Sequence, residues 1–207
     1  MRTRMLLLSI TPVLVFAGTG AYVAQRRTNP MAASRGTAVA VLAGGCYWGV
    51  ESVFRHVRGI TSVTSGFAVP ASASGAVSTA PVEAVRLEYD PSRISYRKIL
   101  DVFFSVVHDP TQLDRQGPDV GAEYRSMVFV DGDAQRLLVR DYIDSLTAAH
   151  VFSGRIVTGV AALQAFHVVD PSQQNYAERH PADPYIVKYD APRIVALRHR
   201  FPEFFKP

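Results

Sequence analysis

The chain has 207 residues, 48% of them hydrophobic, and a formal charge of +4, which suffices for one well-packed domain and requires no second one. Five of its 22 basic residues precede residue 37 without any acidic residue, leaving 17 basic and 18 acidic side chains. This nearly neutral remainder argues against nucleic acid as a partner. A single cysteine excludes an internal disulfide and a cysteine-built metal site, so thiol redox chemistry must finish with an outside thiol.

The N-terminal stretch predicts a leader. Arginines flank twenty uncharged residues, 5–24, and a small, polar segment follows. This pattern is typical of a signal peptide or a single membrane anchor, and both imply a periplasmic or otherwise extracytoplasmic protein, free or membrane-anchored. A translation start at Met31 would remove the leader and leave the protein in the cytoplasm. We therefore expect a leader with its linker over 1–36 and one folded domain over 37–207.

Cys46, the only cysteine, stands at a change from strand to helix. Thr37–Ala43 is a small, apolar, β-branched run of buried-strand type, and apolar residues recur at helical spacing over 50–57. Gly44 and Gly45 permit a tight turn and a close approach of a ligand to the backbone. The free N–H groups and partial positive charge of a helix start favour a thiolate. We therefore expect a lowered pKa for Cys46 and a nucleophilic sulfur.

Two other interpretations of Cys46 fit less well. A free cysteine is often a small buried hydrophobe, but the flanking glycines and aromatic residues favour a functional group. The run Ala-Gly-Gly-Cys is also found at lipoprotein attachment sites, yet Cys46 lies far beyond the leader and precedes an amphipathic helix.

The rest of the chain alternates strands, helices and two loops. The loops, 68–81 and 111–125, lack an apolar period, and the second is expected to carry function. The order strand-helix-strand, repeated once, predicts an α+β domain: a mixed β-sheet with a split βαβ, ferredoxin-like core and peripheral helices on one face. Strands are expected over 60–67, 82–89, 126–130 and 156–160, and helices from Ser95 (as cap), from Asp133, over 171–176 and over 192–201.

Several blocks together resemble the A-type peptide methionine sulfoxide reductases, over about residues 39–205. The resemblance implies a thiol-dependent oxidoreductase without cofactor that reduces the S epimer of methionine sulfoxide, free or in proteins, as repair after oxidative stress. The blocks are Gly45-Cys46-Tyr47-Trp48-Gly49, Val82-Glu83-Ala84-Val85, Tyr89-Asp90-Pro91, His108-Asp109-Pro110-Thr111, 115–121 with Tyr124-Arg125-Ser126, and His180-Pro181 with Pro184-Tyr185-Ile186.

This chemistry needs a thiolate that attacks the sulfoxide sulfur, a proton donor for the oxygen and an apolar cage for the S-methyl group. For Glu83 the residues themselves leave two interpretations: apolar neighbours favour burial and a raised pKa that keeps the carboxyl protonated, whereas a glutamate on an edge strand is more often exposed to solvent. The family position favours the buried acid. By resemblance, Cys46 becomes a sulfenic acid and no metal is used. The implied catalytic residues are Cys46, Glu83 and Tyr124, and the implied substrate-binding residues are Tyr47, Trp48, Phe67 and Asp119.

The chain departs from the family pattern at Phe67, where a tyrosine is usual, in a shortened loop before Glu83, and in lacking C-terminal resolving cysteines. Oxidised Cys46 would therefore need an external thiol of thioredoxin, glutaredoxin or glutathione type. Phe67 favours one alternative, a degenerate member that binds oxidised methionine with little activity. The other alternative is a cysteine acyltransferase or hydrolase with His108 or His167 as base.

Overall fold

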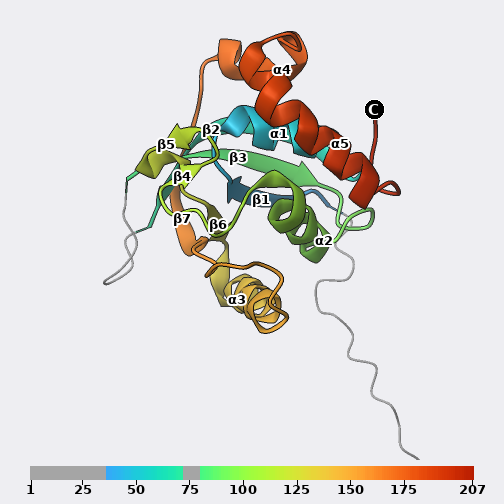
Figure 1. Ribbon diagram of the computed structural model, residues 1–207. Helices are drawn as coiled ribbons and strands as arrows, with labels where there is room; N and C mark the ends of the chain where they lie inside the picture. Colours follow the sequence, from blue (N-terminus) through green and yellow to red (C-terminus); the bar gives the residue numbers. More distant parts are fainter. Residues whose placement is uncertain (1–35, 72–79) are drawn as a thin grey trace, which may run out of the picture. The chain divides into compact units, whose positions relative to one another are not determined.

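The computed structural model describes residues 36–71 and 80–207, and five of its strands close into a barrel (Figure 1). The strand order is β1-β3-β2-β7-β6, and β6 returns to pair with β1. All neighbouring strands are antiparallel except β6 and β7, which are parallel. The bounds are β1 Ala38–Ala43, β2 Ile60–Pro70, β3 Val82–Tyr89, β6 Met127–Val130 and β7 Gly159–Val168.

The prediction of a ferredoxin-like split βαβ sheet is wrong, because that core is an open sheet and this one is closed. Closure depends on β6, which joins β1 on one side and β7 on the other. Alternating apolar residues reveal which segments are strands and which faces they bury, but not which distant strand each edge meets. Pairing between residues some ninety apart, such as Leu42 with Val128, is decided only by tertiary packing.

Two hydrophobic clusters use the two faces of these strands. The inner cluster fills the barrel with mostly small side chains, because five strands enclose a narrow interior. The outer cluster packs the barrel against the helices and includes Leu42, which lies between the inner residues Val41 and Ala43, and Val85, which follows the inner residue Ala84. The inner cluster consists of Val41, Ala43, Ala68, Val82, Ala84, Met127, Phe129 and Ala161.

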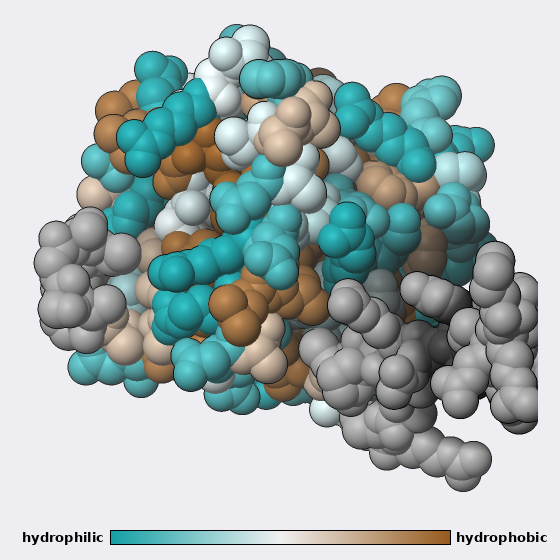
Figure 2. Space-filling view, turned by 90° about the horizontal axis from the view of Figure 1, so that it is seen from below, coloured by the Kyte–Doolittle hydropathy of each residue, from teal (hydrophilic) through white to brown (hydrophobic). Residues whose placement is uncertain are grey.

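Helix α1 crosses the barrel beside the C-terminal segment, and α3 lies at another side, next to β6 and β7 (Figure 1). Seen from below, the surface of the molecule is largely hydrophilic with smaller apolar areas (Figure 2). Helix α3 buries only Val139 and Tyr142 among its residues. Because α1 and α3 lie at different sides of the barrel, the helices do not all cover one face, contrary to the sequence prediction. Their bounds are α1 Tyr47–Arg55, α2 Tyr96–Val102, α3 Gly132–Ala148, α4 Tyr176–Arg179 and α5 Ala191–Arg200.

Short elements connect these parts. The loop expected over 111–125 contains a small two-stranded sheet and one turn of 3₁₀ helix, and α2 continues as a π-helical turn. The connecting elements are η1 Phe103–Val107, β4 Arg115–Gln116, β5 Asp119–Val120, η2 Ala122–Tyr124, η3 Pro171–Gln173 and η4 Ile186–Asp190.

Several local predictions can be compared directly. The Ser95 cap is confirmed, since its Oγ accepts the Lys98 N–H at 3.1 Å. The strand expected over 156–160 is misplaced, because β7 begins at Gly159 and runs on to Val168. Of the loop expected over 68–81, residues 68–70 belong to β2, and 72–79 lie outside the described residues.

The predicted leader, apart from Gly36, also lies outside the described residues. Within residues 36–71 and 80–207, none of the helices is long and apolar enough to cross a membrane.

Candidate active site

The Cys46 turn joins β1 to α1, as the sequence predicts. Cys46 is the N-cap residue of α1 and is 9% exposed. Gly45 has φ +89°, and a Cβ there would collide with the side chain of Gln116. Buried Gln116 is itself held by the backbone of Asp109, which donates its N–H to Oε1 and accepts from Nε2, both at 3.1 Å. Glycine is therefore required at position 45 for its backbone angle and for the close approach.

The carboxyl group of Glu83 lies at the start of α1, against Cys46. Its Oε2 accepts the backbone N–H of Tyr47, the residue that follows Cys46, at 3.0 Å, and the Cys46 side chain is close enough to help lower its pKa. Cys46 itself is the N-cap residue of α1, and its side chain makes no capping hydrogen bond to the helix. The carboxyl thus accepts the first N–H of the helix, next to the N-cap residue that carries the sulfur, which places these two groups side by side.

Burial raises the pKa of Glu83 to about 7. Within that net value the negative charges of Asp119 and Glu123 act in the same direction as burial, and the hydrogen bond from Tyr47 opposes them. This direction confirms the expectation drawn from the apolar neighbours of Glu83. A carboxyl with this pKa is substantially protonated near neutral pH, so it can donate a proton to a ligand.

The expectation of a lowered pKa for Cys46 is wrong for the protein without substrate. Burial raises the pKa of the thiol well above its usual range, and the neighbouring Glu83 charge raises it further. Asp190 and Asp119 act in the same direction, and the Trp48 N–H lowers the pKa too little to offset them. The resting sulfur is therefore a thiol, because desolvation and nearby carboxylates outweigh the helix start.

An aromatic wall lines the helix start. Trp48 stacks on Tyr176 with ring centroids 3.9 Å apart, and Tyr185 meets it edge-on at 6.0 Å. Tyr47 makes edge contacts with Trp48 at 6.3 Å and with Phe67 at 6.1 Å. Tyr47, Trp48 and Phe67, which the sequence assigned to substrate binding, thus form one surface. Tyr176 and Tyr185 complete it and had no role in the prediction, although Tyr185 lies in one of the family blocks.

The polar side of the site is formed by Asp119, Tyr124 and Tyr185. The Tyr185 hydroxyl donates to Asp119 Oδ2 at 2.5 Å. Burial, followed by the charges of Glu83, Asp119 and Cys46, raises the pKa of Tyr124 to about 12, so this hydroxyl stays protonated. The structure therefore brings all seven predicted site residues into one cluster. Their individual roles remain predictions.

Glu51 supports the site from behind and was missed, because a glutamate on an amphipathic helix is usually exposed. It is 1% exposed and accepts hydrogen bonds from Ser65 Oγ and from the backbone N–H of Asn175, each at 2.9 Å. Gln174 makes two further hydrogen bonds to the backbone of Ser65, both at 2.8 Å. These contacts hold the segment that places Tyr176 under Trp48.

The two histidines considered as bases do not serve Cys46. His108 is buried, with Nδ1 3.0 Å from the Phe103 carbonyl oxygen and Nε2 3.1 Å from Thr158 Oγ1, and burial lowers its pKa to about 4. His167 is exposed on β7, opposite Phe67. Neither forms the pair with Cys46 that a cysteine acyltransferase or hydrolase requires.

Replacing Phe67 by tyrosine is expected to speed the reaction of this site. Phe67 is the direct cross-strand partner of Glu83 and touches Tyr47, so the shortened loop has not moved it out of the site. A hydroxyl there would add a donor near the acidic group, and we expect a gain of up to about tenfold in kcat/KM for S-methionine sulfoxide.

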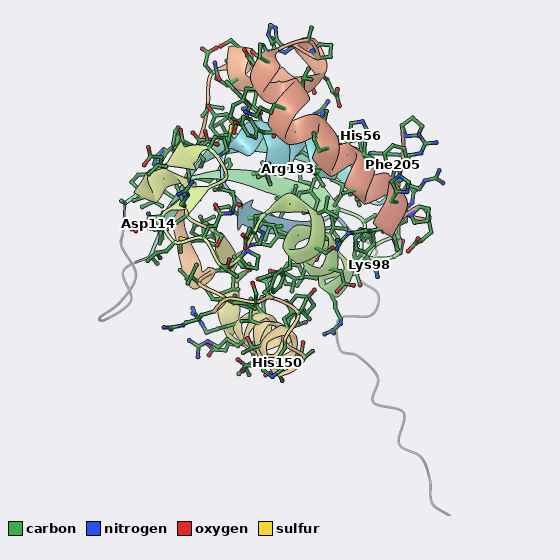
Figure 3. All side chains as sticks on the ribbon, in the orientation of Figure 1. His56, Lys98, Asp114, His150, Arg193 and Phe205 are labelled. Atoms are coloured by element: carbon green, nitrogen blue, oxygen red, sulfur yellow. The ribbon has the colours of Figure 1, made fainter. Side chains whose placement is uncertain are left out.

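The matched control is Phe205→Tyr, a half-buried ring that stacks on His56 at 5.8 Å near the C-terminal end (Figure 3). Its kcat/KM should equal that of the unchanged protein. A flat or lower rate for a correctly folded Phe67→Tyr variant would contradict the expectation.

Comparison with known proteins assigns the family. A family model described as peptide methionine sulfoxide reductase matches residues 38–203. Peptide methionine sulfoxide reductase MsrA 2 of Mesorhizobium japonicum is 38% identical over 179 residues, 84% of this chain and 92% of that protein. Peptide methionine sulfoxide reductase MsrA of Natronomonas pharaonis is 42% identical over 175 residues, 81% of this chain and 97% of that protein.

Solved structures agree. Reduced Mxr1 from Saccharomyces cerevisiae matches with a TM-score of 0.62 and 26% identity, covering 70% of this chain and 86% of that one. Methionine sulfoxide reductase A of Corynebacterium diphtheriae matches with a TM-score of 0.58 and 28% identity, covering 74% and 81%. This chain therefore belongs to the peptide methionine sulfoxide reductase family and, within it, to the A type.

Proposed function

We propose that this methionine (S)-S-oxide reductase works through one cysteine, with Cys46 taking the oxygen of methionine sulfoxide, free or in proteins. The observation that carries the proposal is the position of the Glu83 carboxyl beside Cys46, where its Oε2 accepts the N–H of the next residue, Tyr47, at 3.0 Å. A sulfur nucleophile and a carboxyl with a pKa of about 7 lie together there. The adjoining aromatic wall around Trp48 offers an apolar surface for the S-methyl group.

In the first half-reaction the Cys46 sulfur attacks the sulfoxide sulfur and the S–O bond of the substrate breaks. Glu83 and the Cys46 thiol each give a proton to the oxygen, which leaves as water while an S–S bond joins Cys46 to the substrate. The water then attacks the Cys46 sulfur, that S–S bond breaks, and one proton returns to Glu83. The substrate sulfur gains two electrons and leaves as methionine. Cys46 loses two electrons and carries the oxygen as a sulfenic acid.

The other residues orient the substrate in this scheme. Tyr124 donates a hydrogen bond to the oxygen as it gains negative charge. Tyr47, Trp48 and Phe67 surround the methyl group. Asp119 accepts a hydrogen bond from the Tyr185 hydroxyl. This bond fixes the Tyr185 ring at the edge of Trp48 and so shapes the cage for the methyl group.

The second half-reaction uses thiols from outside the chain, since the sequence contains one cysteine. A first thiol attacks the sulfenic acid, releases water and forms a mixed disulfide on Cys46. A second thiol attacks that disulfide and restores the Cys46 thiol. Thioredoxin, glutaredoxin and glutathione-type donors all supply such thiols. We also propose that residues 1–36 export or anchor the domain 37–207 outside the cytoplasm, which cell fractionation would test.

The expected result without reductant is about one methionine per enzyme in excess S-sulfoxide, followed by a persistent sulfenic acid on Cys46. A sulfenic-specific reagent should trap this species, and added glutathione should convert it to a mixed disulfide detectable by mass. Protein alkylated at Cys46 beforehand is the control and should yield no methionine. If methionine formed with no trappable species and an unchanged thiol titre, the one-cysteine cycle would be refuted.

A further inference from the structure

A second buried carboxyl group lies near the Cys46 turn and has no part in the chemistry above. Asp190, the last residue of η4, is 1% exposed. It occupies the N-cap position of α5, but its side chain makes no capping hydrogen bond to that helix. Among the described residues its Oδ2 has no hydrogen-bond partner, and its Oδ1 lies 3.4 Å from Nη1 of Arg193. The carboxylate is therefore directed away from the helix that it begins.

Asp190 and Arg193 meet α1 at its first turn. A Cβ at Gly49 would collide with Asp190 Oδ1 and with Arg193 Nη1. Figure 3 shows Arg193 where α5 passes α1, and the two helices are in contact. Gly49 is the third residue of α1, whose N-cap is Cys46. The Asp190 carboxylate thus lies against the turn that carries the sulfur.

A purely structural ion pair accounts poorly for this arrangement. A buried carboxylate with one oxygen unpartnered costs free energy, and apolar side chains of similar volume pack at least as well. Arg193 satisfies one oxygen only at 3.4 Å. The position of the charge, next to the Cys46 turn, is what a packing role leaves unexplained.

We propose that Asp190 is a positioning residue for the reduction: held by Arg193 against Gly49, its negative charge keeps the resting Cys46 sulfur protonated until a sulfoxide binds. The inference rests on the proposed role of Cys46 as the attacking sulfur. It is consistent with the titration of both groups. Burial raises the pKa of Asp190 to about 6, which leaves it ionised at pH 8, and its charge raises the pKa of Cys46 after the larger effects of burial and Glu83.

The negative charge of Asp190 protects the Cys46 sulfur from unwanted oxidation and alkylation. Thiolates, rather than thiols, react with peroxides and electrophiles. A sulfenic acid that is oxidised further becomes a sulfinic acid, which thiols do not reduce. The chain has no second cysteine that could capture Cys46 as a disulfide first. Keeping the resting Cys46 sulfur as a thiol slows this irreversible oxidation. The thiol releases its proton when the substrate binds.

Other charged and titratable groups face the same two side chains, so the test must change Asp190 alone. Around Asp190 they are Arg193, Asp119 and Asp183, and around Cys46 they are Glu83, Asp119, Tyr47, Tyr124 and Tyr185.

The test is the rate at which iodoacetamide and hydrogen peroxide modify Cys46 at pH 8 without substrate. Asp190→Asn keeps the shape of the side chain and removes its charge. We expect modification to become about three- to tenfold faster, since a full pKa unit corresponds to tenfold more thiolate. Glu203→Gln, an exposed carboxylate on the same C-terminal segment, is the control and should react at the unchanged rate. An unchanged or slower rate in folded Asp190→Asn, judged by circular dichroism and thermal midpoint, overturns the proposal.

A second measurement uses the unchanged protein and does not depend on the folding of a variant. Thiolate absorbance at 240 nm is followed from pH 6 to pH 10. We expect no thiolate below about pH 9, and a titration at or below the usual cysteine value of about 8.5 overturns the proposal. Turnover by Cys46→Ser would instead refute the proposed function, while the modification rates would still decide whether Asp190 controls this sulfur.

Discussion

Replacing Cys46 by serine is expected to abolish methionine formation while leaving the fold intact. Serine is only slightly smaller, and the Cys46 side chain makes no capping hydrogen bond that the change could remove, so the turn at the start of α1 should persist. Its hydroxyl oxygen cannot take up the sulfoxide oxygen, whereas the cysteine sulfur does so and becomes a sulfenic acid. We expect a loss of at least about a thousandfold, which corresponds to about 4 kcal/mol in the barrier.

The measurement is methionine released from resolved R and S sulfoxide epimers in the presence of dithiothreitol. The unchanged protein should consume the S epimer only, and Glu203→Gln should match it. Circular dichroism and the thermal midpoint establish that Cys46→Ser is folded. Retained turnover by that folded variant would remove Cys46 from the mechanism.

Glu83→Gln is expected to slow the reduction strongly at neutral pH. The amide has the shape of the carboxyl and can still accept the Tyr47 N–H, which Glu83 accepts at 3.0 Å. It cannot supply the proton that the departing oxygen needs. Loss of a positioned acid typically costs about a hundredfold to ten thousandfold, and we expect kcat/KM for the S epimer to fall within that range.

The pH profile gives an independent check on the same residue. Because the pKa of Glu83 is about 7 and the acid acts in its protonated form, kcat/KM of the unchanged protein should fall as the pH rises through about 7. Glu83→Gln should lack this limb. An unchanged rate together with an unchanged profile would show that another group is the acid.

The free energy of unfolding should depend on pH through Glu83. The folded protein holds a proton on Glu83 that the unfolded chain loses near the ordinary value of 4.5, so this group's contribution to the free energy of unfolding falls as the pH rises from about 4.5 to about 7. Glu83→Gln should therefore be more stable, relative to the unchanged protein, at pH 8 than at pH 5. Urea unfolding at both values measures this difference.

Much of the site could be predicted from the sequence because its signals are local. The strand, the two glycines and the apolar spacing after Cys46 predict the turn that the structure contains, and the apolar neighbours of Glu83 together with its place in a family block predict its burial and raised pKa. Short blocks in a characteristic order indicate the family. Each of these inferences depends on residues within a few positions of one another, where backbone geometry and alternation decide the outcome.

Other features depended on contacts between distant parts of the chain. Closure of the barrel needs the pairing of β1 with β6, and the aromatic wall needs Tyr176 and Tyr185 to return to Trp48 from the C-terminal segment. The pKa of Cys46 is raised rather than lowered, contrary to the prediction, for the same reason. The local helix start favours a thiolate, whereas burial and the carboxylates Glu83, Asp119 and Asp190, up to 144 positions away, favour a thiol.

The sequence by itself determined the strand–turn–helix around Cys46 and the family, and through the family the buried acid Glu83, because periodicity, turn chemistry and motif order are properties of neighbouring residues. Only the tertiary structure decided that five strands close into a barrel, which rings form the cage beside Trp48, and that the resting Cys46 sulfur holds its proton. Desolvation and Coulomb energy sum over every group that folding brings near, whatever its place in the chain.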